Sequence, residues 1–131
     1  MNIAMVCTAL LGMSFFALSL HVSLQRRGTL TLTGLSDDPT SALNKAVRAH
    51  GNLAEFAPIL CILMLIAEDL SGAYWVDALC VVVTVARLVT IAGFLWCDSL
   101  AKVHPFRKWG AVFTYLGGFA LSVIVLTQAF V

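Results

Sequence analysis

The chain has 131 residues, of which 60% are hydrophobic and only 11% are charged. Soluble domains usually carry about a quarter charged residues, so this composition excludes an ordinary soluble protein and indicates an integral membrane protein. The formal net charge is +1, and no basic cluster is interleaved with aromatic residues, which argues against a nucleic-acid partner.

Apolar runs divide the chain into segments long enough to cross a bilayer, for which about 20 residues are needed. They cover residues 3–24, 42–67, 74–96 and 109–131. We predict one helix from each run. The fold class is therefore an all-α, integral membrane four-helix bundle that forms one domain over residues 1–131, with the lipid bilayer as its first partner.

The first run is expected to remain in the protein as a helix. It lacks the basic start and the small-residue cleavage site of a signal peptide. It also contains no Asp or Glu. Small four-helix multidrug transporters typically carry an essential acid in their first helix, so this absence disfavours a transporter.

The second run contains polar residues where a membrane helix is usually apolar, namely Arg48, Asn52 and Glu55. On a helix these residues lie at i, i+4 and i+7 and share one stripe. Because hydrocarbon penalises charged groups that lack partners, we expect the stripe to face protein or water and to mark a site. Pro58 lies one turn further and favours a kink.

A cation in the third run offers Glu55 a partner. Glu55 lies about 10 Å deeper than Arg48 at 1.5 Å per residue, and Arg87 lies at a comparable depth. We therefore predict an intramembrane ion pair between Glu55 and Arg87. Such a pair could serve a ligand or only hold two helices together, since stranding one buried partner costs about 3 to 5 kcal/mol. The residues alone leave both roles open.

The connection before the fourth run is basic and carries Lys102, His104, Arg107 and Lys108. These residues can be interfacial cations that follow membrane topology. They can also stabilise an anion such as a thiolate, beside the positive end of the fourth helix. The sequence alone favours the interfacial interpretation.

Cysteine and histidine spacing gives no sign of a metal site. Cys7, Cys61, Cys80 and Cys97 are scattered singly, and no histidine has zinc-ligand spacing to a second ligand. We expect no metal, and we expect the thiols to pack as small hydrophobic groups.

The distribution of charge predicts the topology. Lys and Arg gather around the first and third connections, whereas the middle turn carries Glu68 and Asp69. By the positive-inside rule, the first and third connections are cytoplasmic. Both termini are then expected on the non-cytoplasmic side.

The motif R-A-H-x-N-x-x-E-x-x-P at residues 48–58, followed by A-R-L at 86–88 and by Gly93, resembles the MAPEG family. This family comprises membrane-associated proteins in eicosanoid and glutathione metabolism. The segment L-S-D-D-P at residues 35–39 is similar to the bacterial branch. The resemblance covers essentially the whole chain. It implies a homotrimer in the bacterial inner membrane, with glutathione held at the subunit interfaces.

The resemblance also implies which residues bind the cofactor. Positions that match Arg48, Asn52 and Glu55 contact glutathione in the family, and the position that matches Arg87 supports it. His50 belongs to the same motif and is included among the candidate binding residues.

A catalytic residue is implied in the same way. An arginine near the start of the fourth helix activates the thiol in catalytic members, and Arg107 matches it best, with Lys102 as the alternative. Several members that use glutathione carry tyrosines or other polar side chains where this chain has Phe56, Thr90 and Phe94. Hydroxyl donors are therefore expected to be missing from the pocket.

Two classes of function follow from the resemblance. The first is an enzyme, a membrane-bound glutathione-dependent transferase or peroxidase that lowers the thiol pKa and attacks lipophilic small-molecule electrophiles in the bilayer. The second is a non-catalytic membrane subunit that keeps the scaffold for assembly, and the departures at the pocket favour it somewhat. The sequence does not name the second substrate, and it leaves membership of a larger membrane complex open.

Overall fold

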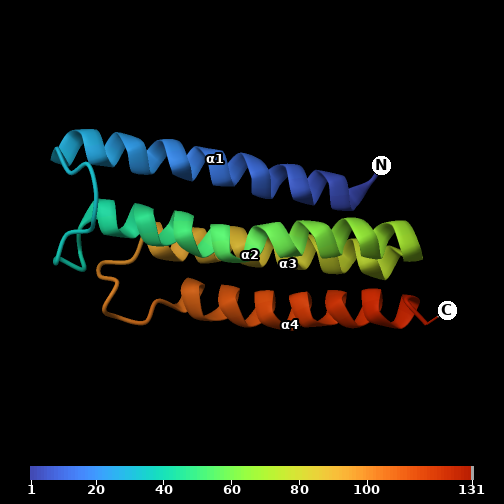
Figure 1. Cartoon of the computed structure of the whole chain (residues 1–131). Coiled ribbons are helices and arrows are strands. Elements are labelled where there is room, and N and C mark those ends of the chain that lie inside the picture. Colours follow the sequence, from blue (N-terminus) through green and yellow to red (C-terminus); the bar gives the residue numbers. More distant parts are fainter. Residues whose placement is uncertain (131) are drawn as a thin grey trace.

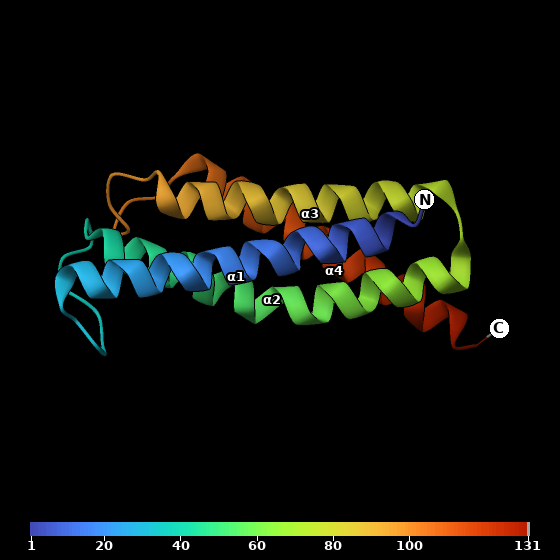
Figure 2. The same cartoon turned by 90° about the horizontal axis from the view of Figure 1, so that it is seen from above.

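The computed structural model describes residues 1–130 as four α-helices joined by three connections (Figure 1). In chain order they are α1 (Ile3–Thr29), α2 (Ala42–Ser71), α3 (Tyr74–Leu95) and α4 (Pro105–Gln128). Successive helices run antiparallel, so both termini lie at the same end as the short α2–α3 turn (Figure 2). The all-α, four-helix prediction is confirmed, whereas the side of the membrane that each end faces stays a prediction.

Helices α1 and α2 extend about one turn beyond their apolar runs, to Thr29 and Ser71. Polar residues continue a helix readily where it leaves the hydrocarbon, because water or neighbouring side chains can solvate them. Helix α2 passes through Pro58 without a break and ends where Gly72 adopts a left-handed conformation with a φ of 56°. Glycine tolerates this conformation, which is the usual way to end a helix.

Helix α4 begins at Pro105, about one turn before the predicted start at residue 109. Proline suits the first helical position because its fixed φ is already helical and its missing N–H would have no partner there. The earlier start places Arg107 in the first turn of α4. The predicted end of this helix, at residue 131, lies outside the described residues.

In residues 1–130, helices α1, α3 and α4 are long and apolar enough to cross a membrane. The remaining predicted span, residues 42–67, forms α2, which does not meet this criterion. Its run is interrupted by Arg48, Asn52 and Glu55. Helix α2 packs against α1, α3 and α4. The chain is an integral membrane protein in which α2 and α3 each pack against the three other helices.

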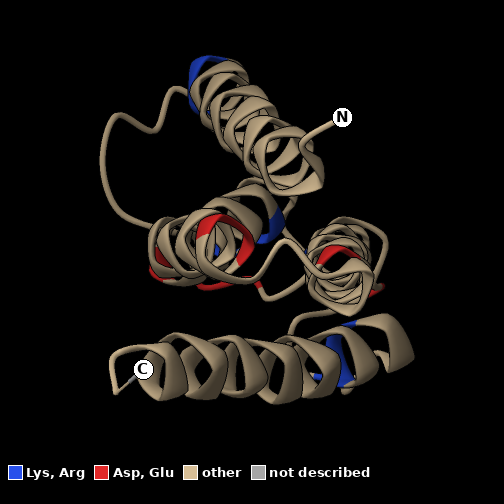
Figure 3. Ribbon diagram, turned by 90° about the vertical axis from the view of Figure 1, so that its right-hand side faces the viewer, with Lys and Arg blue, Asp and Glu red and all other residues tan. Residues whose placement is uncertain are grey.

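The helices form layers rather than a closed ring. Helices α2 and α3 lie side by side, with α1 on one side of this pair and α4 on the other (Figure 3). Within the described residues, α1 and α4 make no contact with each other. The buried core between the layers includes Leu11, Leu53, Met64, Val83 and Leu121.

Two glycines bring α4 close to α3. A Cβ atom on Gly110 would collide with the carbonyl oxygen of Ala86 and the hydroxyl of Thr90, and one on Gly117 would collide with the Val83 side chain. Small residues permit such close approach between membrane helices. This tight seam sets the first turns of α4 against the end of α3, and the cavity described next opens beside it.

Candidate functional site

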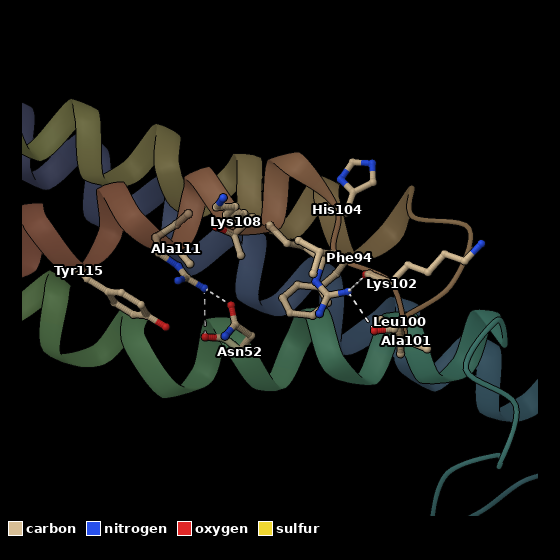
Figure 4. Close-up of a pocket in the computed structure, with 13 residues that line it drawn as sticks. Asn52, Phe94, Leu100, Ala101, Lys102, His104, Lys108, Ala111 and Tyr115 are labelled. Carbon is tan, nitrogen blue, oxygen red and sulfur yellow. Dashed lines mark hydrogen bonds between the residues drawn. The ribbon is translucent and has the colours of Figure 1, made fainter.

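A cavity of about 470 Å³ lies between α2, α3 and α4, beside the α3–α4 connection (Figure 4). Four cations line it, Arg87, Lys102, Arg107 and Lys108. They are half of the eight Lys and Arg residues in the chain. No Asp or Glu is among the described residues that line it. The cavity is therefore electropositive and suits an anionic ligand.

Arg87 is the most deeply buried of these cations, with 1% of its surface exposed. Its Nη2 donates hydrogen bonds to Oδ1 of Asn52 and, at 3.2 Å, to the backbone carbonyl oxygen of Asn52. Its guanidinium lies over the ring of Phe56, with Cζ 4.8 Å from the ring centroid. Hydrogen bonds and a cation–π contact stabilise the charge in this buried setting.

The predicted ion pair between Glu55 and Arg87 is wrong within a single chain. Arg87 binds Asn52 instead, and Glu55 is exposed and does not line the cavity. Equal depth does not fix the direction in which a side chain points. Asn52 and Glu55 are three residues apart, so they diverge by about 60° around the helix axis, and the amide is the group that faces α3.

Arg48 and His50, the other residues of α2 predicted to bind glutathione, do not line the cavity of a single chain. Arg48 is exposed, as Glu55 is, and does not line the cavity. His50 packs against Phe15 of α1, with ring centroids 4.7 Å apart. Because His50 is two residues from both Arg48 and Asn52, helical geometry turns it to another side of α2.

The structure brings both predicted catalytic cations, Arg107 and Lys102, to the same cavity. Nη1 of Arg107 donates to the carbonyl oxygens of Leu100 and Lys102, each at 3.3 Å. Its Cζ lies 4.6 Å from the centroid of the Phe94 ring. The Lys102 side chain is exposed and extends away from Asn52 (Figure 4). Arg107 is thus held at the cavity, beside the positive end of the α4 dipole.

Tyr115 lines the cavity, although the sequence did not single it out. Its hydroxyl points towards Asn52 (Figure 4), and its ring lies 5.7 Å from that of Phe56. Tyr115 therefore supplies a hydroxyl donor that was expected to be missing. A signal was present, because Tyr115 lies eight residues after Arg107 and so falls on the same face of a helix.

Thr90 is the other hydroxyl residue among the described lining residues. Its Oγ1 donates to the carbonyl oxygen of Ala86 at 2.8 Å, within its own helix. The Thr90 hydroxyl is therefore already engaged, and Tyr115 carries the hydroxyl with the greater freedom to meet a ligand.

Comparisons with known proteins show to which family the chain belongs. The MAPEG family profile matches residues 3–127, a range that includes every residue lining the cavity. Two relatives, from Escherichia coli strains K12 and O6:H1 (CFT073), are both named inner membrane protein YecN. Each is 34% identical to this chain, and the alignment covers 83% of this chain and 93% of the relative. The chain therefore belongs to the MAPEG family.

Proposed function

We propose that this chain binds glutathione in the cavity between α2, α3 and α4 and acts as a membrane-bound transferase or peroxidase on lipophilic electrophiles. The convergence of four cations on a cavity without a carboxylate in its described lining carries the proposal. Glutathione has two carboxylates and one ammonium group, so it is anionic at neutral pH and gains charge-assisted hydrogen bonds from such a lining. Membership of the MAPEG family supports the same ligand.

The cavity residues divide the work in this proposal. Asn52 and Arg87 hold the peptide at the inner part of the cavity, and Arg107 stabilises the thiolate, with Lys102 as the alternative. Positive charge and a helix N-terminus both lower a thiol pKa. In the transferase reaction, the thiolate sulfur forms a bond to the electrophilic carbon of the substrate, and the leaving group departs with its electron pair.

We also propose that the functional unit is a homotrimer. Arg48 and Glu55 are exposed on α2 of a single chain, in a region where lipid would leave their charges without partners. A neighbouring copy packed on this face would shield both residues and bring them to a ligand. The trimeric number comes from the family resemblance, and the mass of the protein in mild detergent tests it. A monomeric mass would contradict the proposal.

The proposed location is the bacterial inner membrane, with both termini on the non-cytoplasmic side. The relatives in E. coli are named inner membrane proteins. Lys102, Arg107 and Lys108 lie at the end opposite the termini, which the positive-inside rule assigns to the cytoplasm. Labelling of a C-terminal tag from the cytoplasmic side would contradict this orientation.

One observation favours a second candidate, a non-catalytic assembly subunit. Arg87 is bonded to Asn52, and Arg107 is bonded to Leu100 and Lys102. Arginines engaged in this way could serve only to hold the helices and the α3–α4 connection together.

Titration of the purified protein with glutathione separates the two candidates. The enzyme proposal predicts saturable binding and the appearance of ultraviolet thiolate absorbance. Arg107→Gln should remove this absorbance and largely spare affinity. Arg27→Gln is the matched control, since Arg27 does not line the cavity, and it should change neither quantity. No binding to the wild-type protein at millimolar glutathione would refute the enzyme proposal and favour the assembly subunit.

A further inference from the structure

The α1–α2 connection contacts the mouth of the cavity without lining it. The backbone N–H of Leu100 donates to the carbonyl oxygen of Pro39 at 2.9 Å. The carbonyl oxygen of Leu100 in turn accepts from Nη1 of Arg107 at 3.3 Å. Leu100 is therefore held on one side by the α1–α2 connection and on the other by the cation proposed to act on the thiol.

Asn44, in the first turn of α2, fixes the shape of this connection. Its side chain is 6% exposed. Its Oδ1 accepts from the N–H of Ser36 at 3.0 Å, and its Nδ2 donates to the carbonyl oxygens of Ser36 at 2.6 Å and Asp38 at 2.8 Å. A buried amide that satisfies three hydrogen bonds on one turn has one favoured position, so the turn is fixed relative to α2.

The turn is closed on its other side by Asp38. Its carboxylate accepts from the hydroxyl of Thr40 at 2.7 Å and from the N–H of Thr40 at 2.8 Å. These hydrogen bonds, the hydroxyl first, lower the pKa of Asp38 below its usual 3.8. Pro39 lies between Asp38 and Thr40, and its ring fixes its own φ. Hydrogen bonds on both sides of the turn therefore fix the position of the Pro39 carbonyl group, which accepts from the N–H of Leu100.

Few other hydrogen bonds hold the mouth segment, residues 98–104. Within the described part of the chain, its remaining backbone N–H bonds are local, from Ala101 and Lys102 to Ser99. The bond to Pro39 is therefore the link that ties this segment to the α1–α2 connection.

We propose that Asn44 and the turn at residues 36–40 form a positioning device for the cavity. Asn44 fixes the turn, Pro39 holds Leu100, and Leu100 orients Arg107 towards the ligand. The role towards a thiol rests on the proposed function, but the device itself belongs to the ligand-free protein and can be tested there.

The first test compares the wild-type protein with Asn44→Leu, which keeps the side-chain volume and removes all three hydrogen bonds. Hydrogen exchange at the Leu100 amide should become roughly tenfold faster, as expected when a supporting hydrogen-bond network is lost. Modification of Arg107 by an arginine-specific dicarbonyl reagent, followed by mass spectrometry, should also accelerate.

Asn2→Leu is the matched control, because it makes the same substitution at the opposite end of the bundle. Asn2 accepts from the N–H of Met5 at 2.7 Å and caps α1. Losing this cap should leave exchange at Leu100 and modification of Arg107 at their wild-type rates. Acceleration as large as that in Asn44→Leu would show a global loosening and overturn the proposal.

A second variant guards against loss of folding. Asn44→Ala removes the same three hydrogen bonds without placing a branched apolar side chain against the turn, so it should accelerate both rates as Asn44→Leu does. Wild-type rates at Leu100 and Arg107 in whichever variant folds would overturn the proposal, whether or not glutathione binds.

Measurements with glutathione bound distinguish a role of Asn44 in positioning Arg107 from a role in supporting the fold. With glutathione bound, Asn44→Leu should raise the pKa of the bound thiol while changing affinity less. An unchanged thiol pKa would overturn the positioning role. If the wild-type protein fails to bind glutathione, the proposed function is refuted, and the exchange and modification rates still decide whether Asn44 positions Arg107.

Discussion

The two ends of the helix bundle use their polar groups in different ways. At the end with both termini, Oε2 of Glu68 accepts the N–H of Ala4 at 2.6 Å, and Asn2 accepts the N–H of Met5, so side chains satisfy the free donors of α1. At the cavity end, four cations share a cavity whose described lining holds no carboxylate. At the first end, side chains of the chain itself accept the hydrogen bonds of these α1 donors. At the cavity end, the cations can still bind an anion.

The largest expected effect comes from removing the buried cation at the cavity end. Arg87→Ala leaves Asn52 without its partner and exposes a void beside Phe56, so the free energy of unfolding should fall by about 2 to 4 kcal/mol. Arg87→Lys keeps the charge and loses the planar contact with Phe56. Its free energy of unfolding should therefore lie between those of the wild-type protein and Arg87→Ala. Denaturant unfolding in detergent measures both. Wild-type stability of Arg87→Ala would show that Arg87 is not needed for the fold.

A smaller loss is expected at the seam between α3 and α4. Gly110→Ala forces its Cβ against Ala86 and Thr90, which should cost about 1 to 3 kcal/mol and loosen the adjacent cavity. Gly12→Ala is the control. No atom lies within 4 Å of a Cβ at Gly12, so this change should stabilise α1 by roughly 0.5 to 1 kcal/mol. Equal thermal stability of the two variants would contradict the close approach.

A substitution at the end with both termini should affect stability and leave ligand binding intact. Glu68→Ala removes the acceptor for the N–H of Ala4 and should lower the free energy of unfolding by about 1 kcal/mol. Glutathione affinity should stay at the wild-type value, because Glu68 does not line the cavity. A large fall in affinity would show that the two ends are not independent.

The smallest effect concerns pH at the α1–α2 connection. The pKa of Asp38 is lowered by its hydrogen bonds to Thr40, so the ionised form is favoured in the folded protein. Its stabilising contribution is fully present above the usual pKa of 3.8 and is lost as pH falls through the lowered folded value. Protection of the Thr40 amide against hydrogen exchange, measured relative to the intrinsic exchange rate at each pH, should therefore fall as the pH falls through this lowered value. Asp38→Asn should make this protection independent of pH in the same range, and a pH dependence of the protection that persists would assign it to another group.

The sequence predicted the helices better than the directions of their side chains. Long apolar runs are sufficient to number and order the helices, and local chemistry at Pro105 explains the shifted start of α4. The rotation of each helix about its own axis depends on how the helices pack, and this packing cannot be read from a single sequence. Glu55 and Arg87 matched in depth and still failed to pair, since Asn52 faced α3 instead. The spacing between Arg107 and Tyr115 indicates a shared helix face only once α4 is known to begin at Pro105, before Arg107.

Lysine reactivity is a direct test of whether glutathione binds in the electropositive cavity. The lysines of the chain are Lys45, Lys102 and Lys108, of which the last two line the cavity. Amine-specific labelling, with and without glutathione, can be read at each lysine by mass spectrometry. If glutathione occupies the cavity, it should protect Lys102 and Lys108 from labelling and leave the labelling of Lys45 unchanged. Unchanged labelling at all of them, or protection confined to Lys45, would contradict it.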